Sequence, residues 1–314
     1  MSKIYVKPIG GLCNRLRAID SMLWVAEDCG KRLVVIWERN QSLNCSFEDL
    51  FVKPASFDLL EIKHSWFWPS KHIHSFPEVL PKSLHQRLMV GLLKSRLGVN
   101  TTFFFDELAG KLKPLRPVTP AKYKNVSAFD EHVYPIFQPV TEKLKQEEAS
   151  YISTCWRMVG GPNYSALFEP THEIACEVRG IAQQFNQETF GIHVRGTDAE
   201  TARRFSSVRA FENRIQHVID QNPRASFYLA SDEPEIKQRL IDKFPSRIFF
   251  LEQASYGRNA SENIKNALVD LLCLSETRAI HGAYFSTFSQ VAADWKGIEE
   301  STVFREDLTV ETNP

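Results

Sequence analysis

Short apolar runs alternate with helical patterns through the second half of the chain. The apolar runs, which have the length of buried strands, lie at residues 190–195, 226–230, 247–251 and 279–282. Apolar residues recur at helical spacing in stretches that begin near residues 208, 234, 261 and 287. Strict alternation of strand and helix predicts a parallel sheet wrapped by helices.

The first half opens with a related pattern. Residues 3–9 and 32–37 have the apolar, β-branched character of buried strands, and the helical pattern of residues 15–29 separates them. Strand, Gly-rich turn, helix and strand predict a Rossmann-like opening.

The rest of the first half is less regular. We expect a helix at 84–97 and strands at 101–105 and 151–158, whereas residues 115–134 have few periodic apolar positions and are predicted to be irregular. Turn residues cluster at 160–163 and mark a boundary. The sequence therefore predicts two α/β domains, residues 1–165 and 166–314, with a cleft between them.

Polar residues gather where the strand at 190–195 ends. His193, Arg195, Thr197 and Asp198 fall within six positions. Ligands of open α/β sheets bind beyond the carboxyl ends of the strands, and a guanidinium there suits a phosphate or diphosphate. The alternative is a surface pair between Arg195 and Asp198.

Three further polar positions in the second half are candidates for the same sheet edge. Asp232 follows a strand and either binds a ligand or caps the helix that begins at Pro234. Asp270 falls at the border of a buried helical stripe, where a carboxylate needs a partner. The run Ser286-Thr-Phe-Ser289 opens a helix, and its hydroxyl and N–H groups suit a diphosphate, although one hydroxyl is enough for an N-cap.

The Gly10-Gly11 turn in the first half is a weaker signal. Two glycines let the backbone approach a ligand closely, and Asn14 and Arg15 follow at the start of a helix. Alternatively, the glycines only make the turn and Asn14 caps the helix. The turn lacks the Gly-x-Gly-x-x-Gly spacing of nicotinamide-binding folds.

Residues 63–74 are rich in tryptophan, histidine and proline. The aromatic side chains of Trp66 and Trp68 suit stacking on a sugar ring of an acceptor, and a packed loop is the alternative.

Composition narrows the class of protein. Thirty-eight basic residues balance 38 acidic ones, so no overall field favours nucleic acid or an anionic membrane. No stretch has the length needed to span a bilayer, and the N-terminus lacks a signal-peptide core. Six scattered cysteines without a Cys-x-x-Cys pair argue against a disulfide framework or zinc site and favour a cytoplasmic protein.

Taken together, the motifs resemble those of the GDP-fucose-dependent fucosyltransferase superfamily. That group includes α1,2-, α1,6- and protein O-fucosyltransferases and the rhizobial nodulation enzyme. The residues that carry the resemblance occur in the same order and are Gly10-Gly-Leu-Cys-Asn-Arg-Leu16, His193-Val-Arg-Gly-Thr-Asp198, Tyr228-Leu-Ala-Ser-Asp232, Asp270 and Ser286-Thr-Phe-Ser289. The resemblance covers about residues 3–295.

The resemblance implies a GT-B-like α/β fold in which two Rossmann-type domains have parallel sheets that face a cleft. It also implies an inverting, metal-independent glycosyltransferase without a cofactor. Such an enzyme moves fucose or a related sugar from a GDP-sugar, bound mainly by the second domain, to a glycan or glycoconjugate acceptor.

Site residues follow from the same resemblance. Arg195 would hold the β-phosphate and stabilise the leaving GDP, His193 would position the donor, and Asp270 would contact the guanosine. Gly11 and Asn14 would reach across the cleft from the first domain. The other residues expected to bind the donor are Gly10, Arg15, Thr197, Asp198, Asp232, Ser286, Thr287, Phe288 and Ser289.

Two points of the resemblance stay open. The α1,6-type members carry two consecutive arginines where this chain has Arg195-Gly196, so a second guanidinium comes from Arg203 or Arg204 or is absent. Glu200 follows the motif and is the candidate general base.

Other classes of protein compete with a transferase. A non-catalytic protein that binds nucleotide sugars or phosphate would keep the donor residues, and the missing second arginine favours it. A nicotinamide oxidoreductase is disfavoured because the dinucleotide fingerprint is absent.

Overall fold

The computed structural model describes residues 2–63, 82–115, 122–196, 200–252 and 257–305, without the side chains of residues 82–87, 89, 200 and 201. The chain divides into two compact units. The first consists of Met1–Glu48, Val52–Arg116 and His132–Pro162, and the second of Asp49–Phe51, Pro117–Glu131 and Asn163–Pro314.

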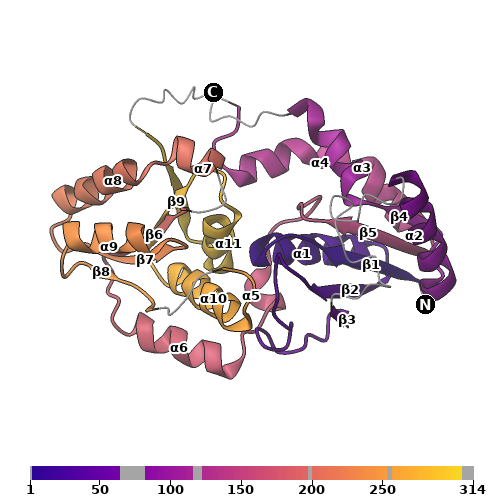
Figure 1. The fold of residues 1–314 in the computed structure, drawn as a ribbon, viewed down its shortest axis with the longest axis horizontal. Coiled ribbons are helices and arrows are strands. Elements are labelled where there is room, and N and C mark those ends of the chain that lie inside the picture. Colours follow the sequence, from indigo (N-terminus) through magenta and orange to yellow (C-terminus); the bar gives the residue numbers. More distant parts are fainter. Residues whose placement is uncertain (1, 64–81, 116–121, 197–199, 253–256, 306–314) are drawn as a thin grey trace. The chain divides into compact units, whose positions relative to one another are not determined.

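The first unit is built on a parallel five-stranded sheet of order β3-β2-β1-β5-β4 (Figure 1). Its strands are β1 (Lys3–Pro8), β2 (Arg32–Arg39), β3 (Asp58–Lys63), β4 (Thr101–Phe103) and β5 (Ala149–Thr154). Its helices are α1 (Leu12–Asp28), α2 (Lys82–Leu97), α3 (Phe105–Leu112), the short 3₁₀ turn η2 (Lys113–Leu115) and most of α4 (Val126–Gln146). The strands β1 and β2 are almost continuously apolar because helices cover both of their faces.

Helix α4 corrects one sequence prediction. Residues 115–134 are not irregular throughout, because α4 begins at Val126 and continues past Pro135 and Pro139. The two prolines leave the carbonyls of Glu131 and Pro135 without an N–H partner, and both of these residues are exposed to water. The buried apolar stripe of the helix is Val126, Phe129, Val133, Phe137, Val140 and Leu144.

The second unit contains another parallel five-stranded sheet, of order β10-β9-β6-β7-β8. Its strands are β6 (Thr189–Val194), β7 (Ser226–Ser231), β8 (Ile248–Phe249), β9 (Ala279–Ala283) and β10 (Glu299–Val303). Its helices are α5 (Tyr164–Leu167), α6 (His172–Ala182), α7 (Glu200–Phe205), α8 (Val208–Gln221), α9 (Pro234–Lys243), α10 (Ser261–Ser275) and α11 (Thr287–Lys296). Two parallel sheets wrapped by helices confirm the predicted α/β class.

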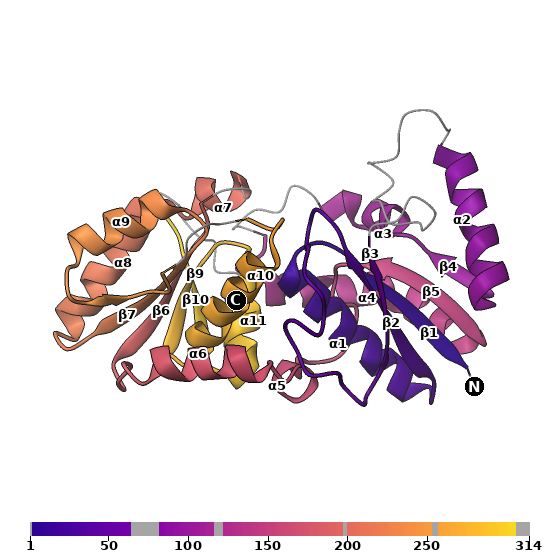
Figure 2. The same ribbon diagram turned by 60° about the horizontal axis from the view of Figure 1, so that its bottom comes forward.

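Side chains of β6 alternate between two helical layers. Ile192 and Val194 pack with Phe211 of α8 on one face of the sheet, whereas His193 stacks on Phe288 of α11 on the other. Figure 2 shows the same division, with α8 and α9 on one side of the second sheet and α6, α10 and α11 on the other.

Each sheet has one point at which the strand order reverses. In the second sheet the chain runs outward through β6, β7 and β8 and then returns to place β9 on the other side of β6. In the first sheet the chain runs outward through β1, β2 and β3, then forms β4 at the opposite edge and places β5 between β4 and β1. Ligands of open α/β sheets bind outside the carboxyl ends of the strands at such switch points.

A segment from the first half of the sequence packs onto the second sheet. The Tyr284 hydroxyl donates to the carbonyl of Tyr123 at 3.1 Å, and Thr302 donates to the carbonyl of Lys124 at 3.4 Å. Phe129 meets Phe285 edge to face with ring centres 5.3 Å apart. The second unit is therefore assembled from segments that are distant in the sequence.

Two further observations bear on the class of protein. Within the described residues, no helix combines the length and the apolar character needed to cross a membrane. All six cysteines are free thiols.

Candidate functional site

His193 is the penultimate residue of β6, at the switch point of the second sheet, and its imidazole is buried. The ring stacks on Phe288 with centroids 4.8 Å apart, and its Nδ1 lies 3.4 Å from the Ser286 hydroxyl. Burial and, to a smaller extent, the neighbouring Arg195 lower the pKa of His193 to about 3, against the opposing effect of Asp232. The imidazole is therefore uncharged at neutral pH and serves as a hydrogen-bonding group.

Arg195 follows β6 and is held by Asp232 from the end of the neighbouring strand. Val194 pairs with Ser231 in the sheet register, which sets Arg195 opposite Asp232. The guanidinium Nη1 lies 3.3 Å from Asp232 Oδ2, and both side chains keep about a quarter or less of their surface exposed, 21% and 26%. Asp232 Oδ1 also accepts the N–H of Gly196 at 2.7 Å. Asp232 thus positions the Arg195 loop, and the N-cap of α9 is Glu233, without a side-chain capping bond.

Gly196 is surrounded too closely to carry a side chain. A Cβ at this position would lie 2.6 Å from Glu233 Cβ and 2.4 Å from Glu233 Oε2, with Ile236 Cδ1 at 3.1 Å. The Glu233 carboxylate therefore occupies the space that the side chain of an arginine at position 196 would need. Arg203 and Arg204, the other candidates for a second cation, are exposed on α7.

The turn before α11 lies at the same switch point, after β9. Ser286 caps the helix by accepting the N–H of Phe288 at 3.3 Å. An α-helix leaves its first N–H groups without intrahelical acceptors and carries positive potential at that end. Ser286, Thr287 and Phe288 are partly exposed, so this turn is open to a ligand.

Phe285 enters the turn with left-handed backbone geometry, φ 55°. A residue with a large side chain adopts this region at a cost of roughly 1–2 kcal/mol. Packing of its ring against Phe129 and Tyr284 holds it there. No sequence signal marked Phe285, because phenylalanine carries no turn preference.

Ser289 lies inside the protein. Its side chain is fully buried, and its hydroxyl donates to the carbonyl of Ser286 at 3.3 Å. Ser289 therefore shapes the turn from within, while Ser286 and Thr287 lie at the surface.

Asp270 on α10 is buried and accepts a 2.6 Å hydrogen bond from the hydroxyl of Tyr228 on β7. Burial and the nearby Asp270 raise the pKa of Tyr228 well above its ordinary value, so the hydroxyl stays protonated as the donor. Tyr228 is thus a hydrogen-bond partner of the buried Asp270 carboxylate. Tyr228 belongs to the motif that ends at Asp232, but the sequence suggested no role for it.

The Gly10-Gly11 turn lies after β1, at the switch point of the first sheet. Gly10 has φ +87°, and a Cβ there would lie 2.9 Å from Asn14 Nδ2. Gly11 is the N-cap of α1 and no side chain caps the helix, so Asn14 lies inside the first turn, partly exposed.

Arg15 is buried beneath this turn. Its guanidinium donates to the carbonyls of Gly10 at 2.9 Å and Glu38 at 2.5 Å and to Asn40 Oδ1 at 3.1 Å. Its Cζ lies 4.9 Å from the centre of the Trp37 ring. Burial lowers the pKa of Arg15 to about 10, which leaves it charged at neutral pH. These contacts tie the glycine turn to the end of β2.

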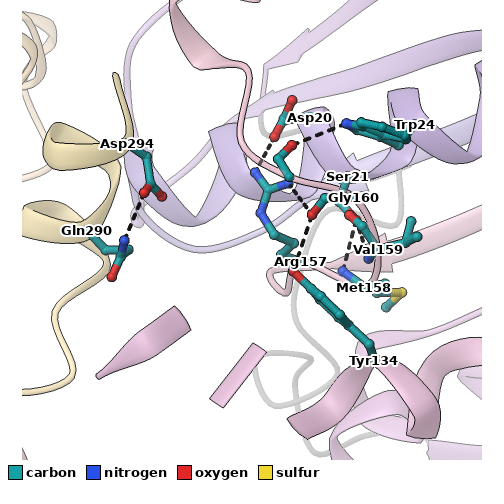
Figure 3. Close-up of polar contacts among 11 residues, drawn as sticks. Asp20, Ser21, Trp24, Tyr134, Arg157, Met158, Val159, Gly160, Gln290 and Asp294 are labelled. Atoms are coloured by element: carbon teal, nitrogen blue, oxygen red, sulfur yellow. Dashed lines mark hydrogen bonds and ion pairs between the residues drawn. The ribbon is translucent and has the colours of Figure 1, made fainter. Parts of the chain in front are cut away.

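The loop after β5 at the same switch point is fixed by α1 (Figure 3). Arg157 pairs with the buried Asp20, and its Nη1 donates to the carbonyl of Gly160 at 3.3 Å. Ser21 accepts the N–H groups of Met158 and Val159 at 2.9 and 3.1 Å. Buried side chains therefore hold both the turn after β1 and the loop after β5 in place.

Some of the expected site residues cannot be placed. Thr197 and Asp198 lie outside the described residues, as do Trp66 and Trp68 of the aromatic segment. Glu200 begins α7, but its side chain is not described. The second unit brings together His193, Arg195, Asp232, Ser286 and Phe288. Across the described part of the chain, no group of three or more His, Cys, Asp or Glu side chains is arranged to hold a metal ion.

Comparison with known proteins defines the class of fold. A scan of the sequence against protein-family models finds no match, and a search of curated proteins finds none either. Solved structures match over nearly the whole chain, and those described below are GT-B-like fucosyltransferases. The match confirms the predicted fold and the predicted resemblance in fold to this group.

Three of these structures illustrate the likeness. The NodZ α-1,6-fucosyltransferase, an enzyme from Bradyrhizobium, here soaked with GDP-fucose, matches with TM-score 0.57 and 13% identity over 94% of this chain and 92% of its own. A variant of Arabidopsis thaliana FUT1 in complex with GDP matches with TM-score 0.53 and 14% identity over 98% and 71%. The apo-form of POFUT1 matches with TM-score 0.52 and 12% identity over 96% and 97%.

Proposed function

We propose that the chain is a glycosyltransferase that moves fucose, or a related sugar, from a GDP-sugar to a hydroxyl group of a glycan or glycoconjugate acceptor. The observation that carries the proposal is Arg195, held by Asp232 at the switch point of the second sheet beside the capped start of α11. Solved fucosyltransferases with the same fold contain GDP or GDP-fucose, and this supports the choice of donor.

The proposed reaction is a single displacement with inversion that needs no metal. The acceptor oxygen forms a bond to the anomeric carbon while the bond from that carbon to the β-phosphate oxygen breaks. The electron pair of the broken bond leaves with GDP, and the acceptor proton passes to a base, for which Glu200 is the candidate.

Arg195 stabilises the charge that develops on the departing diphosphate. A fixed cation needs no reorganisation as the charge forms, and losing one such donor typically costs roughly 2.7–4 kcal/mol of transition-state stabilisation. Asp232 balances the charge of Arg195 before the donor arrives and keeps the guanidinium in place. The helix dipole of α11 and the hydroxyl groups of Ser286 and Thr287 add to the diphosphate site.

The remaining residues have supporting roles in this proposal. Neutral His193 and Phe288 position the donor without adding charge, and Asp270 contacts the guanosine. Gly10, Gly11 and Asn14 form the contribution of the first domain, whereas Arg15 holds their turn in shape. Thr197 and Asp198 complete the donor site. A cytoplasmic role in glycan biosynthesis is consistent with six free thiols.

The decisive test compares Arg195→Ala with Arg224→Ala. Arg224 is exposed in the turn before β7, at the opposite edge of the same sheet, and is a matched control for the loss of one arginine. We expect donor hydrolysis by Arg195→Ala to fall by about a hundredfold or more, with an unchanged unfolding midpoint and with normal hydrolysis by Arg224→Ala. Wild-type hydrolysis in Arg195→Ala would remove this residue from the mechanism. EDTA is expected to leave the rate unchanged.

A non-catalytic nucleotide-sugar-binding protein is the second candidate. The observation that favours it is the carboxylate of Glu233 in the space where a second consecutive arginine would begin. Calorimetry with GDP, GDP-fucose, GDP-mannose and UDP-sugars separates the two. GDP binding without turnover on any acceptor would identify the binding protein, and no affinity for any GDP compound would exclude both.

A further inference from the structure

Helix α2 carries apolar side chains on two different faces. Val90, Leu93 and Leu97 belong to the core cluster that covers the first sheet. Leu88 and Leu92 lie one turn apart on the other side of the helix, where 53% and 37% of their surface stays exposed. Leu88 is the most exposed of the large apolar side chains that the structure describes. The core of the first unit therefore uses only one of the two apolar faces of α2.

The space beside these two leucines is open. Gly91 lies on the same side of the helix, and a Cβ added to it would meet nothing within 4 Å. Both views of the fold show α2 at the edge of the first unit (Figures 1 and 2). Leu88, Gly91 and Leu92, which we call the outer face of α2, therefore form an exposed apolar ridge.

The charged residues of α2 are all positive. The helix contains no aspartate or glutamate, and its four lysine and arginine residues are Lys82, Arg87, Lys94 and Arg96. Lys94 and Arg96 lie in the last turn, directly after the two exposed leucines, and both are exposed. Because basic and acidic residues balance over the whole chain, the positive field of α2 is local. A partner of this helix should therefore offer both apolar surface and negative charge.

We propose that the outer face of α2 binds reversibly to a membrane surface that contains anionic lipids. A helix that lies in the plane of such a surface inserts its apolar side chains between the head groups, and its basic side chains attract the anionic lipids. Lysine and arginine reach the head groups while their aliphatic stems lie along apolar neighbours. A second copy of the chain suits this face less well, because it would bring like charges together.

Co-sedimentation with lipid vesicles in a buffer of about 0.1 M salt tests this surface. The wild type should bind vesicles of equimolar phosphatidylglycerol and phosphatidylcholine about tenfold more tightly than vesicles of phosphatidylcholine alone. Lys94→Glu/Arg96→Glu should lose this preference. Leu88→Gln/Leu92→Gln should bind the anionic vesicles about fivefold more weakly than the wild type. Absence of wild-type binding to the anionic vesicles would overturn the proposal, and so would equal binding by the wild type and both variants.

A variant that gains binding keeps the test independent of any loss of folding. Gly91→Leu adds an apolar side chain to the ridge, and leucine favours a helix over glycine. It should bind the anionic vesicles about fivefold more tightly than the wild type. Gly180→Leu is the matched control, because Gly180 is exposed on α6 with nothing within 4 Å of an added Cβ. Equal affinities of Gly91→Leu and Gly180→Leu would refute the role of the ridge.

Sedimentation velocity without lipid distinguishes the membrane from a second copy of the chain. A wild type that binds no vesicles but forms a dimer, which Leu88→Gln/Leu92→Gln disperses, would identify the outer face of α2 as an interface between copies and overturn the proposal. Vesicle binding does not depend on the proposed function, since none of the substituted residues belongs to the proposed donor site. Donor hydrolysis by these variants should therefore match that of the wild type.

Discussion

The close packing around Gly196 leads to a prediction about the loop that carries Arg195. Alanine at this position places a methyl group 2.6 Å from Glu233 Cβ, and that atom cannot rotate away because it is attached to the backbone at the start of α9. The loop or the helix start must move. Because Asp232 precedes Glu233 and accepts the Gly196 N–H, the movement also displaces the partner of Arg195.

The expected cost follows from the kind of clash. Forcing an extra methyl group into a packed position typically costs about 1–3 kcal/mol. Glu233→Gly removes both the Cβ and the carboxylate, and glycine at an N-cap is tolerated with a loss of only a few tenths of a kcal/mol. The double variant Gly196→Ala/Glu233→Gly should therefore recover most of the stability that Gly196→Ala loses, with Ile236 Cδ1 at 3.1 Å as the remaining close contact.

Urea unfolding of the wild type, both single variants and the double variant measures this coupling. Gly180→Ala is the matched control, because Gly180 lies on α6 with nothing within 4 Å of an added Cβ. It should stabilise the protein by about 0.5–1 kcal/mol, since alanine favours a helix interior. Calorimetry should show weaker GDP binding by Gly196→Ala. Wild-type stability in Gly196→Ala, or a cost that Glu233→Gly does not relieve, would refute the argument.

Three other predictions concern buried polar groups. Tyr228→Phe removes the hydroxyl donor of buried Asp270 and should lower the free energy of unfolding in urea by about 1–3 kcal/mol; an unchanged urea midpoint would contradict this. Arg15→Met removes the buried cation that donates to the carbonyls of Gly10 and Glu38 and should lower the free energy of unfolding by about 3–5 kcal/mol in the same assay. A smaller loss of stability than that of Tyr228→Phe would contradict this prediction. The pKa of Glu300 rises from its usual 4.5 to about 7 on folding. The stability that this group contributes is therefore complete below about pH 4.5 and is lost as pH rises through 7, by about 3 kcal/mol at roughly 1.4 kcal/mol per tenfold change in proton affinity. Urea unfolding from pH 5 to 8 should show this loss in the wild type and not in Glu300→Gln, and equal slopes would contradict it.

The α/β class could be predicted because buried parallel strands are nearly continuous apolar runs, as β1, β2 and β7 are. Strand β10 gave no such signal, since it lies at the edge of its sheet and begins with Glu299 and Glu300. Helix α4 was missed because the window that was considered irregular ends at residue 134 and contains only the first three positions of its apolar stripe, Val126, Phe129 and Val133.

The candidate site was predictable only residue by residue. The sequence pointed to Arg195 and Asp232 separately, as polar groups at strand ends. Their pairing depends on the register of β6 against β7, which no local pattern encodes. The space that Glu233 takes beside Gly196 and the left-handed backbone of Phe285 likewise arise from packing.

Tyr123 and Phe129 pack against the second sheet although they precede all of its strands in the sequence, so a single cut in the chain does not separate the two units. A fragment that begins at Asn163 would contain all five strands of that sheet but would lack the residues that hold Tyr284 and Phe285. Such a fragment should expose apolar surface next to the proposed diphosphate turn and aggregate. During synthesis, the end of this sheet is completed by a segment that left the ribosome more than a hundred residues before β10.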